Sequence, residues 1–162
     1  MSYKPAIDVE DIESRASTTY PEAFRGPVVD RFRRVLGNHF GLSQFGVNYV
    51  ELAPGAWSAQ RHWHTAEDEL VYIVQGKLTL VTDDGKQQLT AGMVAGFPAG
   101  VENGHHLINE SSATAAYLEV GTRNPAADEV FYPDIDLELR SDGAGGRDFR
   151  RRDGSSYDAA GD

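Results

Sequence analysis

The histidines of this 162-residue chain include a pair whose spacing suits metal binding. His62 and His64 are two residues apart, so in an extended strand both side chains point to the same face. Glu69 follows after four intervening residues, and a turn over 65–68 would return its carboxylate to the same side. Imidazole and carboxylate together suit divalent first-row ions such as iron, manganese, nickel, copper or zinc. This segment therefore predicts a site for a divalent transition metal.

A second histidine pair lies downstream of a turn formed by Pro98, Ala99 and Gly100. His105 and His106 are consecutive, so in an extended segment they face opposite sides, and one of them can point inward as a fourth ligand. The chain has no cysteine, which excludes disulfides, thiolate ligands and a cysteine nucleophile. Any metal must therefore be held by nitrogen and oxygen atoms.

These two segments resemble the two sequence motifs of the cupin family. Residues 55–76 resemble the first motif, G-x5-H-x-H-x(3,4)-E-x6-G, and residues 92–109 resemble the second, G-x5-P-x-G-x2-H-x3-N. The resemblance extends over residues 47–119 and is strongest to small bacterial cupins that have no agreed function. It implies an all-β double-stranded β-helix, the cupin or jelly-roll barrel, with N- and C-terminal arms. It also implies a metal bound at the centre of the barrel by His62, His64, Glu69 and His105.

The chain departs from the cupin motifs at two points. Six residues rather than five separate Gly55 from His62, so Gly55 need not occupy the usual turn. Four residues rather than two separate the turn glycine from His105, which leaves His106 open as an alternative ligand. The three-residue interval from His105 to Asn109 matches the motif and favours His105.

Residues beside the motifs have more ordinary predicted roles. Trp63 should point away from the ligands and pack under a terminal arm, while Glu67 and Asp68 form a solvated turn. Tyr72 is expected in the core between the sheets rather than at the site. Glu119 would be a base only if its strand turns it inward. Apolar side chains are expected to line the interior of the barrel: Val71, Ile73, Phe97 and Leu107.

Short runs of alternating or β-branched residues predict an all-β chain. The expected strands cover residues 44–52, 70–75, 77–82, 86–89, 94–97, 105–108 and 115–121. The predicted divisions are an N-terminal arm over 1–40, a barrel core over 41–122, a packing segment over 123–140 and a Gly/Asp-rich tail over 141–162. Residues 31–36 fit either a strand or one helical turn.

Composition limits the partners of the chain. With 15 Lys and Arg against 25 Asp and Glu, its net charge of −10 disfavours nucleic acid. The basic run over 147–152 is expected to be solvated or salt-bridged. No stretch is apolar enough for a membrane helix, and the first fifteen residues lack the apolar block of a secretory signal, so we expect a cytoplasmic protein.

Two classes of function follow from the resemblance. The first is a metal-dependent enzyme, of oxygenase or isomerase type, acting on a small oxygen-bearing organic molecule. The alternative is a non-catalytic cupin that binds or senses a small molecule or a metal, and no evident acid–base residue beside the ligands supports it. A third reading is a dimerisation scaffold with a vestigial site. A homodimer is expected in any case, formed by strand addition or exchange of arms.

Overall fold

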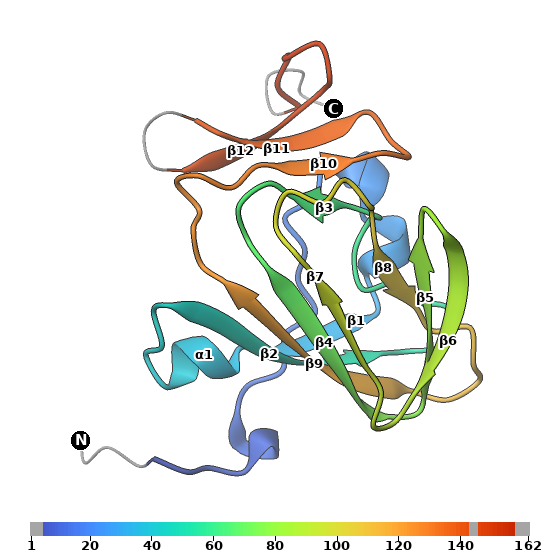
Figure 1. Ribbon diagram of the computed structural model, residues 1–162. Coiled ribbons are helices and arrows are strands. Elements are labelled where there is room, and N and C mark those ends of the chain that lie inside the picture. The colour runs from blue at the N-terminus through green and yellow to red at the C-terminus, as the bar shows by residue number, and fades with distance from the viewer. Residues whose placement is uncertain (1–4, 143–145, 158–162) are drawn as a thin grey trace.

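The computed structural model describes residues 5–142 and 146–157, and most of this chain forms a barrel of antiparallel strands (Figure 1). Helical structure is confined to the N-terminal segment. Three single-turn 3-10 helices precede the barrel, at Val9–Asp11, Glu22–Phe24 and Gly26–Val28, and one short helix, α1, spans Leu36–His39.

The larger wall of the barrel is a five-stranded antiparallel sheet with the order β1-β2-β9-β4-β7. In that order the strands span Arg31–Arg34, Phe45–Leu52, Ala115–Thr122, Glu69–Gln75 and Val94–Phe97. β9 is central because it pairs with β2 along its whole length and with β4 on its other edge. This pairing places Glu69 of β4 beside Gly121 of β9 and beside Phe97 of β7.

The opposite wall is a three-stranded sheet with the order β6-β5-β8. β6 spans Gly85–Thr90, β5 spans Lys77–Thr82 and β8 spans His106–Ile108. β5 and β6 form a hairpin in which Thr82 pairs with Gly85, and the glycine adopts a φ of 117° that an L side chain rarely tolerates.

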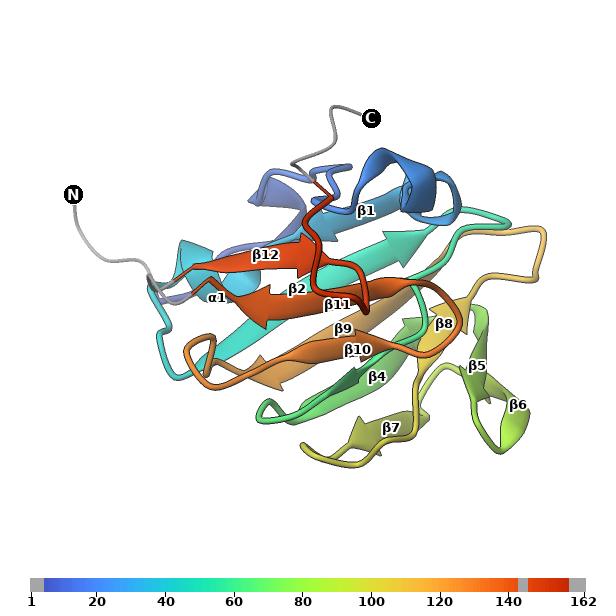
Figure 2. The same cartoon turned by 90° about the horizontal axis from the view of Figure 1, so that it is seen from above.

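A third sheet crosses one end of the barrel, where Figures 1 and 2 show it above β2, β9 and β4. Its order is β12-β11-β10-β3, with the bounds Arg147–Arg150, Leu137–Ser141, Val130–Tyr132 and Trp63–His64. β3 contains one of the predicted ligands, and it pairs with β10 through Val130–His64 and Phe131–Trp63. The C-terminal segment therefore holds the strand that presents His64.

Two apolar clusters surround the end of the barrel where the histidines lie. The barrel core includes Val50, Leu52, Ile73, Leu107 and Tyr117, all at most 2% exposed. The second cluster lies between the N-terminal segment and the third sheet, and it is formed by Tyr20, Val28, Val130, Tyr132 and Leu137 with partly buried aromatic residues around them.

The strands agree with the predicted runs, and residues 31–34 form a strand rather than a helical turn. The basic run at 147–152 is salt-bridged as expected, since Arg147 pairs with Asp128 and Arg150 with Asp148. Of the predicted tail, residues 143–145 and 158–162 lie outside the described residues. None of the helices in the described part of the chain is long and apolar enough to span a membrane.

The prediction that Tyr72 lies in the core between two sheets is wrong, because Tyr72 is 43% exposed on the outer face of the five-stranded sheet. Glu69, Val71 and Ile73 alternate to the inside of β4, so Tyr72 must point outward. No second sheet in the described structure covers that face, whereas the prediction assumed one.

Candidate metal centre

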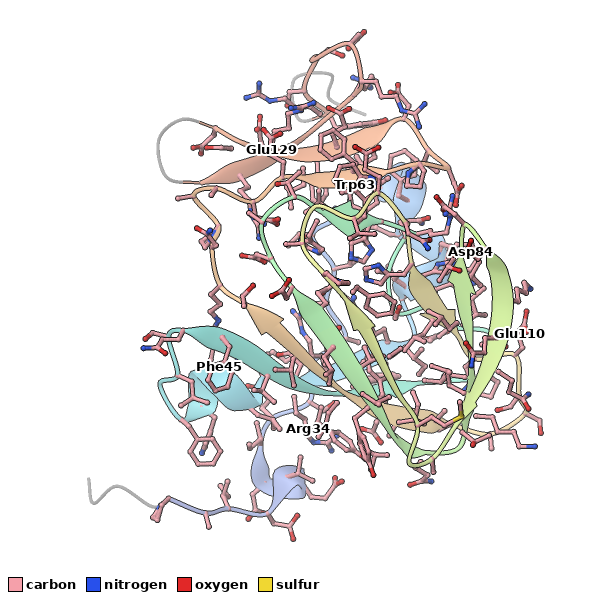
Figure 3. The ribbon with its side chains drawn as sticks, viewed as in Figure 1. Arg34, Phe45, Trp63, Asp84, Glu110 and Glu129 are labelled. Atoms are coloured by element: carbon pink, nitrogen blue, oxygen red, sulfur yellow. The ribbon has the colours of Figure 1, made fainter. Side chains whose placement is uncertain are left out.

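His62 and His64 project toward each other from one short extended segment, with their ring centroids 5.1 Å apart. His62 also forms a backbone bridge with His105, which brings the second histidine segment alongside the first. Trp63 lies between the two ligands and points away from them (Figure 3), since its ring stacks on Phe131 of β10 with centroids 4.8 Å apart. The predicted outward position of Trp63 is thereby confirmed.

Glu69 is the point at which the three histidines meet. Its Oε2 lies 2.8 Å from Nε2 of His105 and 3.5 Å from Nε2 of both His62 and His64. The ligand atoms of His62, Glu69 and His105 all lie within 4.8 Å of one another. All four predicted site residues therefore come together, although they derive from three separate segments of the chain.

The orientation of each imidazole is set by contacts on its far side. His62 Nδ1 lies 2.8 Å from the carbonyl oxygen of Gln60, and His64 Nδ1 lies 2.7 Å from Asp128 Oδ2. A carbonyl or carboxylate at Nδ1 favours the tautomer in which Nε2 carries the free lone pair. The ring of His105 lies parallel to Phe97, with centroids 3.6 Å apart and an interplanar angle of 1°.

The ionisation of Glu69 and His105 favours metal binding, whereas at His64 burial lowers the imidazole pKa but the bond with Asp128 and the nearby carboxylates raise that pKa above its ordinary value. Burial raises the pKa of Glu69, but hydrogen bonds with His105 and His62 and the nearby imidazoles bring that pKa well below its ordinary value. Burial lowers the pKa of His105, so this imidazole is neutral at neutral pH. Three imidazole nitrogens and one carboxylate suit a divalent first-row ion, and the acceptors at two of the Nδ1 atoms leave Nε2 available. The residues present therefore fit such an ion.

Asp128 is a residue of the site that the sequence analysis missed. It is fully buried, and besides His64 its carboxylate accepts hydrogen bonds from Ala66 N at 3.0 Å and from Arg147 at 3.1 Å. Burial raises its pKa, but the bond with His64 and its other donors lower the pKa below the ordinary value. An acidic pair, Asp128 and Glu129, directly before the apolar run VFY was the available signal, but spacing could not connect Asp128 with His64.

His106 and Asn109 resolve the remaining questions about the second motif. His106 Nδ1 lies 3.0 Å from the carbonyl oxygen of Ala59, and its ring packs edge-on against Trp57 rather than joining the other imidazoles. The geometry therefore favours His105. Asn109 holds a turn, since its Nδ2 donates to the carbonyl oxygens of Leu52 and Ala113, at 2.8 Å in each case.

Glu67 and Asp68 were expected to form a solvated turn, but their carboxylates accept hydrogen bonds from neighbouring backbone N–H groups. Glu67 accepts a hydrogen bond from Asn124 N at 2.6 Å, and Asp68 accepts one from Ala99 N at 2.8 Å. Glu67 also forms a metal-capable group with His64 and Asp128, but these carboxylates already bind backbone N–H groups or Arg147. This group therefore acts as a support for the turn and for His64.

A cavity of about 200 Å³ opens beside His62, Glu69 and His105. It has an apolar side, which includes the predicted lining residues Val71, Phe97 and Leu107, whereas Ile73 is buried in the core. Its polar lining includes Arg31, Tyr117 and Glu119. A second cavity of about 300 Å³ lies on the other side of Phe97 and His105, and its walls are more apolar. The first cavity can hold a small polar molecule against Glu69, His62 and His105.

Comparisons with known proteins identify the family. A family model for the cupin domain matches residues 48–121. The chain is also 43% identical to a structure described as a sugar phosphate isomerase from a cupin superfamily, from Silicibacter pomeroyi, with 94% of this chain and 96% of that chain covered and a TM-score of 0.88. The chain belongs to the cupin superfamily. No curated protein matches it.

Two further solved structures are similar over about three quarters of the chain. One, from Acidithiobacillus ferrooxidans, is provisionally described as a sugar phosphate isomerase; identity is 29%, coverage is 75% of this chain and 76% of that chain, and the TM-score is 0.69. The polyketide cyclase RemF from Streptomyces resistomycificus is 19% identical, with 74% of this chain and 80% of that chain covered and a TM-score of 0.61. The likeness to RemF concerns the fold alone.

Proposed function

We propose that this cupin is a metal-dependent isomerase of small hydroxy-carbonyl molecules, with sugar phosphates as the first class to test. The observation that carries the proposal is the meeting of three histidine Nε2 atoms at the Glu69 carboxylate, which lies with His62 and His105 on the wall of a small cavity. The cupin that is 43% identical supports isomerase chemistry over oxygenase chemistry, because it is described as a sugar phosphate isomerase.

The ion would be held by His62, His64, Glu69 and His105. A divalent ion bound there would act as a Lewis acid that polarises a carbonyl or hydroxyl oxygen of the substrate. The imidazoles of His62 and His64, oriented by Gln60 and Asp128, hold their positions without reorganisation during the reaction.

Glu119 is the residue we propose as the proton carrier. On β9, Glu119 pairs with Val71 of β4, and Val71 faces the interior on the same side of β4 as Glu69. The carboxylates of Glu119 and Glu69 therefore both face the interior of the barrel. Glu119 lines the cavity, and one of its oxygens accepts a hydrogen bond from Asn48 Nδ2 at 2.8 Å. The other oxygen has no hydrogen bond to the rest of the described chain, so it is available to a substrate.

The proton balance of an aldose–ketose isomerisation needs one such group. The Glu119 carboxylate would take the proton from the carbon beside the carbonyl, the C–H electron pair would form the carbon–carbon double bond, and the carbonyl π pair would move to its oxygen to give an enediolate. Transfer of the neighbouring hydroxyl proton to the former carbonyl oxygen, and delivery of a proton from Glu119 to the former carbonyl carbon, give the isomer. The proton held on Glu119 exchanges with solvent before delivery, so solvent hydrogen enters the product. Neither an oxidant nor a reductant is required.

The test is proton exchange catalysed by the metal-loaded chain. Aldose phosphates incubated in D2O with the protein should incorporate deuterium at the carbon beside the carbonyl and accumulate the ketose, as followed by NMR. Glu119→Gln should lower the rate by at least about a hundredfold. Glu110→Gln, on the outer side of β5 and β6 (Figure 3), should leave the rate unchanged. Tight binding of metal and sugar phosphate without exchange would favour the non-catalytic cupin instead.

We also propose that the protein is a homodimer, joined through the outer face of the five-stranded sheet. Large apolar residues are exposed there on the neighbouring strands β4 and β7 and on the edge strand β1: Leu70 at 42%, Tyr72 at 43%, Val74 at 40%, Val94 at 57% and Phe32 at 40%. The terminal arms pack on their own chain, which leaves this face rather than arm exchange as the route to a dimer. A two-fold axis would set the same apolar face of each copy against the other.

A further inference from the structure

Arg31 is a cation on the cavity wall that has no anionic partner among the described residues. It lies on β1, and its side chain faces the interior because its register partner, Leu52, is buried there. Its guanidinium donates to the carbonyl oxygen of Ser58 through Nη1, and to that of Ser17 through Nη2 at 3.5 Å. None of the carboxylates in the described part of the chain forms an ion pair with it.

Unused donors are concentrated at this cavity. Within the described residues, three buried side-chain polar atoms lack a hydrogen-bond partner: Arg31 Nε, Tyr117 Oη and His105 Nδ1. All three residues line the cavity that contains Glu69. Buried polar groups are seldom left without a partner, because each one costs free energy. Their presence around one cavity is therefore typical of a place where a ligand supplies the missing acceptors.

The positions of Arg31 and Tyr117 fit a shared ligand. Burial raises the pKa of the Tyr20 and Tyr117 hydroxyls. The nearby Arg31 guanidinium lowers both pKa values, but by less. The net rise keeps the Tyr117 hydroxyl protonated, so this group can donate a hydrogen bond. The Nε of Arg31 is free and Nη2 has only a long bond, and an Arg edge of this kind binds two oxygens of one anionic group.

We infer that Arg31 and Tyr117 bind the anionic oxygen group, phosphate or carboxylate, of a small hydroxylated substrate whose other end lies at the histidines and Glu69. That the anion is part of a substrate rests on the proposed isomerase function. That Arg31 and Tyr117 bind an anion does not depend on that function. Arg31 precedes residues 48–121, the region matched by the family model, whereas Tyr117 lies within it, so the subsite joins a residue outside the matched cupin domain to one inside it. Glu119, in the same cavity, disfavours further negative charge on the remainder of the substrate.

Anion binding by the metal-free chain tests the inference separately from turnover. Protein treated with a chelator is titrated calorimetrically with inorganic phosphate and, in a parallel series, with glycolate. Saturable binding of either probe by the wild type is expected, and the tighter probe distinguishes a phosphate subsite from a carboxylate subsite. Arg31→Met should weaken that binding by at least about tenfold, and Arg31→Lys should restore only part of it, because lysine lacks the two-donor edge.

Two further variants separate binding from folding. Tyr117→Phe removes an unpartnered hydroxyl, so it should weaken anion binding several-fold while the melting temperature stays the same or rises. Lys86→Met removes one positive charge from β6, outside the cavity, and should leave the affinity unchanged. Absence of saturable binding in the wild type, or equal affinities in wild type and a folded Arg31→Met, would overturn the inference. Anion binding without isomerisation would overturn the proposed function alone.

Discussion

His64 Nδ1 and Asp128 Oδ2 lie 2.7 Å apart, although 64 positions separate the two residues in the chain. Asp128 is also bound by Arg147 of β12, so a residue of the C-terminal sheet is linked through one carboxylate to an imidazole of the candidate metal centre. The cupin barrel alone does not supply these contacts, because Asp128 and Arg147 follow the region matched by the family model, residues 48–121. The C-terminal segment therefore orients His64 as well as covering the barrel.

Asp128→Asn should weaken metal binding. The amide lacks the negative charge that orients the His64 ring and increases its basicity, and loss of such a contact costs about 10- to 100-fold in metal affinity. Competition between the protein and a chromogenic chelator for Zn²⁺ or Co²⁺ measures the affinity, and thermal melting of the metal-free protein monitors folding. Asp136→Asn is a matched control, since Asp136 accepts from Arg152 N at 2.8 Å, away from the histidines. Equal affinities for Asp128→Asn and wild type would show that this contact does not support the site.

The apolar sheet face should determine the oligomeric state. We expect the wild-type chain to have twice the monomer mass by light scattering, and the Tyr72→Asp variant to have the monomer mass. The reason is that burying an unpaired charge between two apolar faces costs free energy. Gln87→Asp places the same charge on β6, where the side chain is exposed, and should leave the dimer intact. A monomeric wild type at micromolar concentration would refute the proposed interface.

Gly76 should be necessary for the turn between β4 and β5. Its φ is +79°, and a Cβ at this position would lie 2.9 Å from the Cβ of Ala115. Gly76→Ala should therefore lower the free energy of unfolding by roughly 1–3 kcal/mol, as measured by denaturant titration. At Gly26 a Cβ would meet nothing within 4 Å, so Gly26→Ala should have almost no destabilising effect. Similar losses for the two variants would contradict this explanation.

Sequence spacing was sufficient to predict the site residues that lie close together in the chain or at fixed positions of a motif. His62 and His64 share a face because they are two apart in an extended segment, and the intervals around Glu69 and His105 match motifs that resemble those of cupins. The strands were predictable for the same reason, since alternation is a local property.

Contacts between distant segments were not predictable in this way. Asp128 reaches His64 only because β10 pairs with β3, and Arg31 faces the cavity only because β1 pairs with β2. Neither pairing has a local sequence signal. The error at Tyr72 has a related origin, because alternation shows that two faces differ but does not show which of them another sheet covers.

The measurement that tests the central claim most directly is the metal content of purified, metal-loaded protein, determined by elemental analysis together with X-ray absorption at the metal edge. We predict one divalent ion per chain, with three imidazole nitrogens and one carboxylate oxygen among its ligands, and loss of the ion in a folded His62→Ala, His64→Ala double variant. Negligible metal in the wild type, or an equal amount in that variant, would contradict a metal centre formed by these residues.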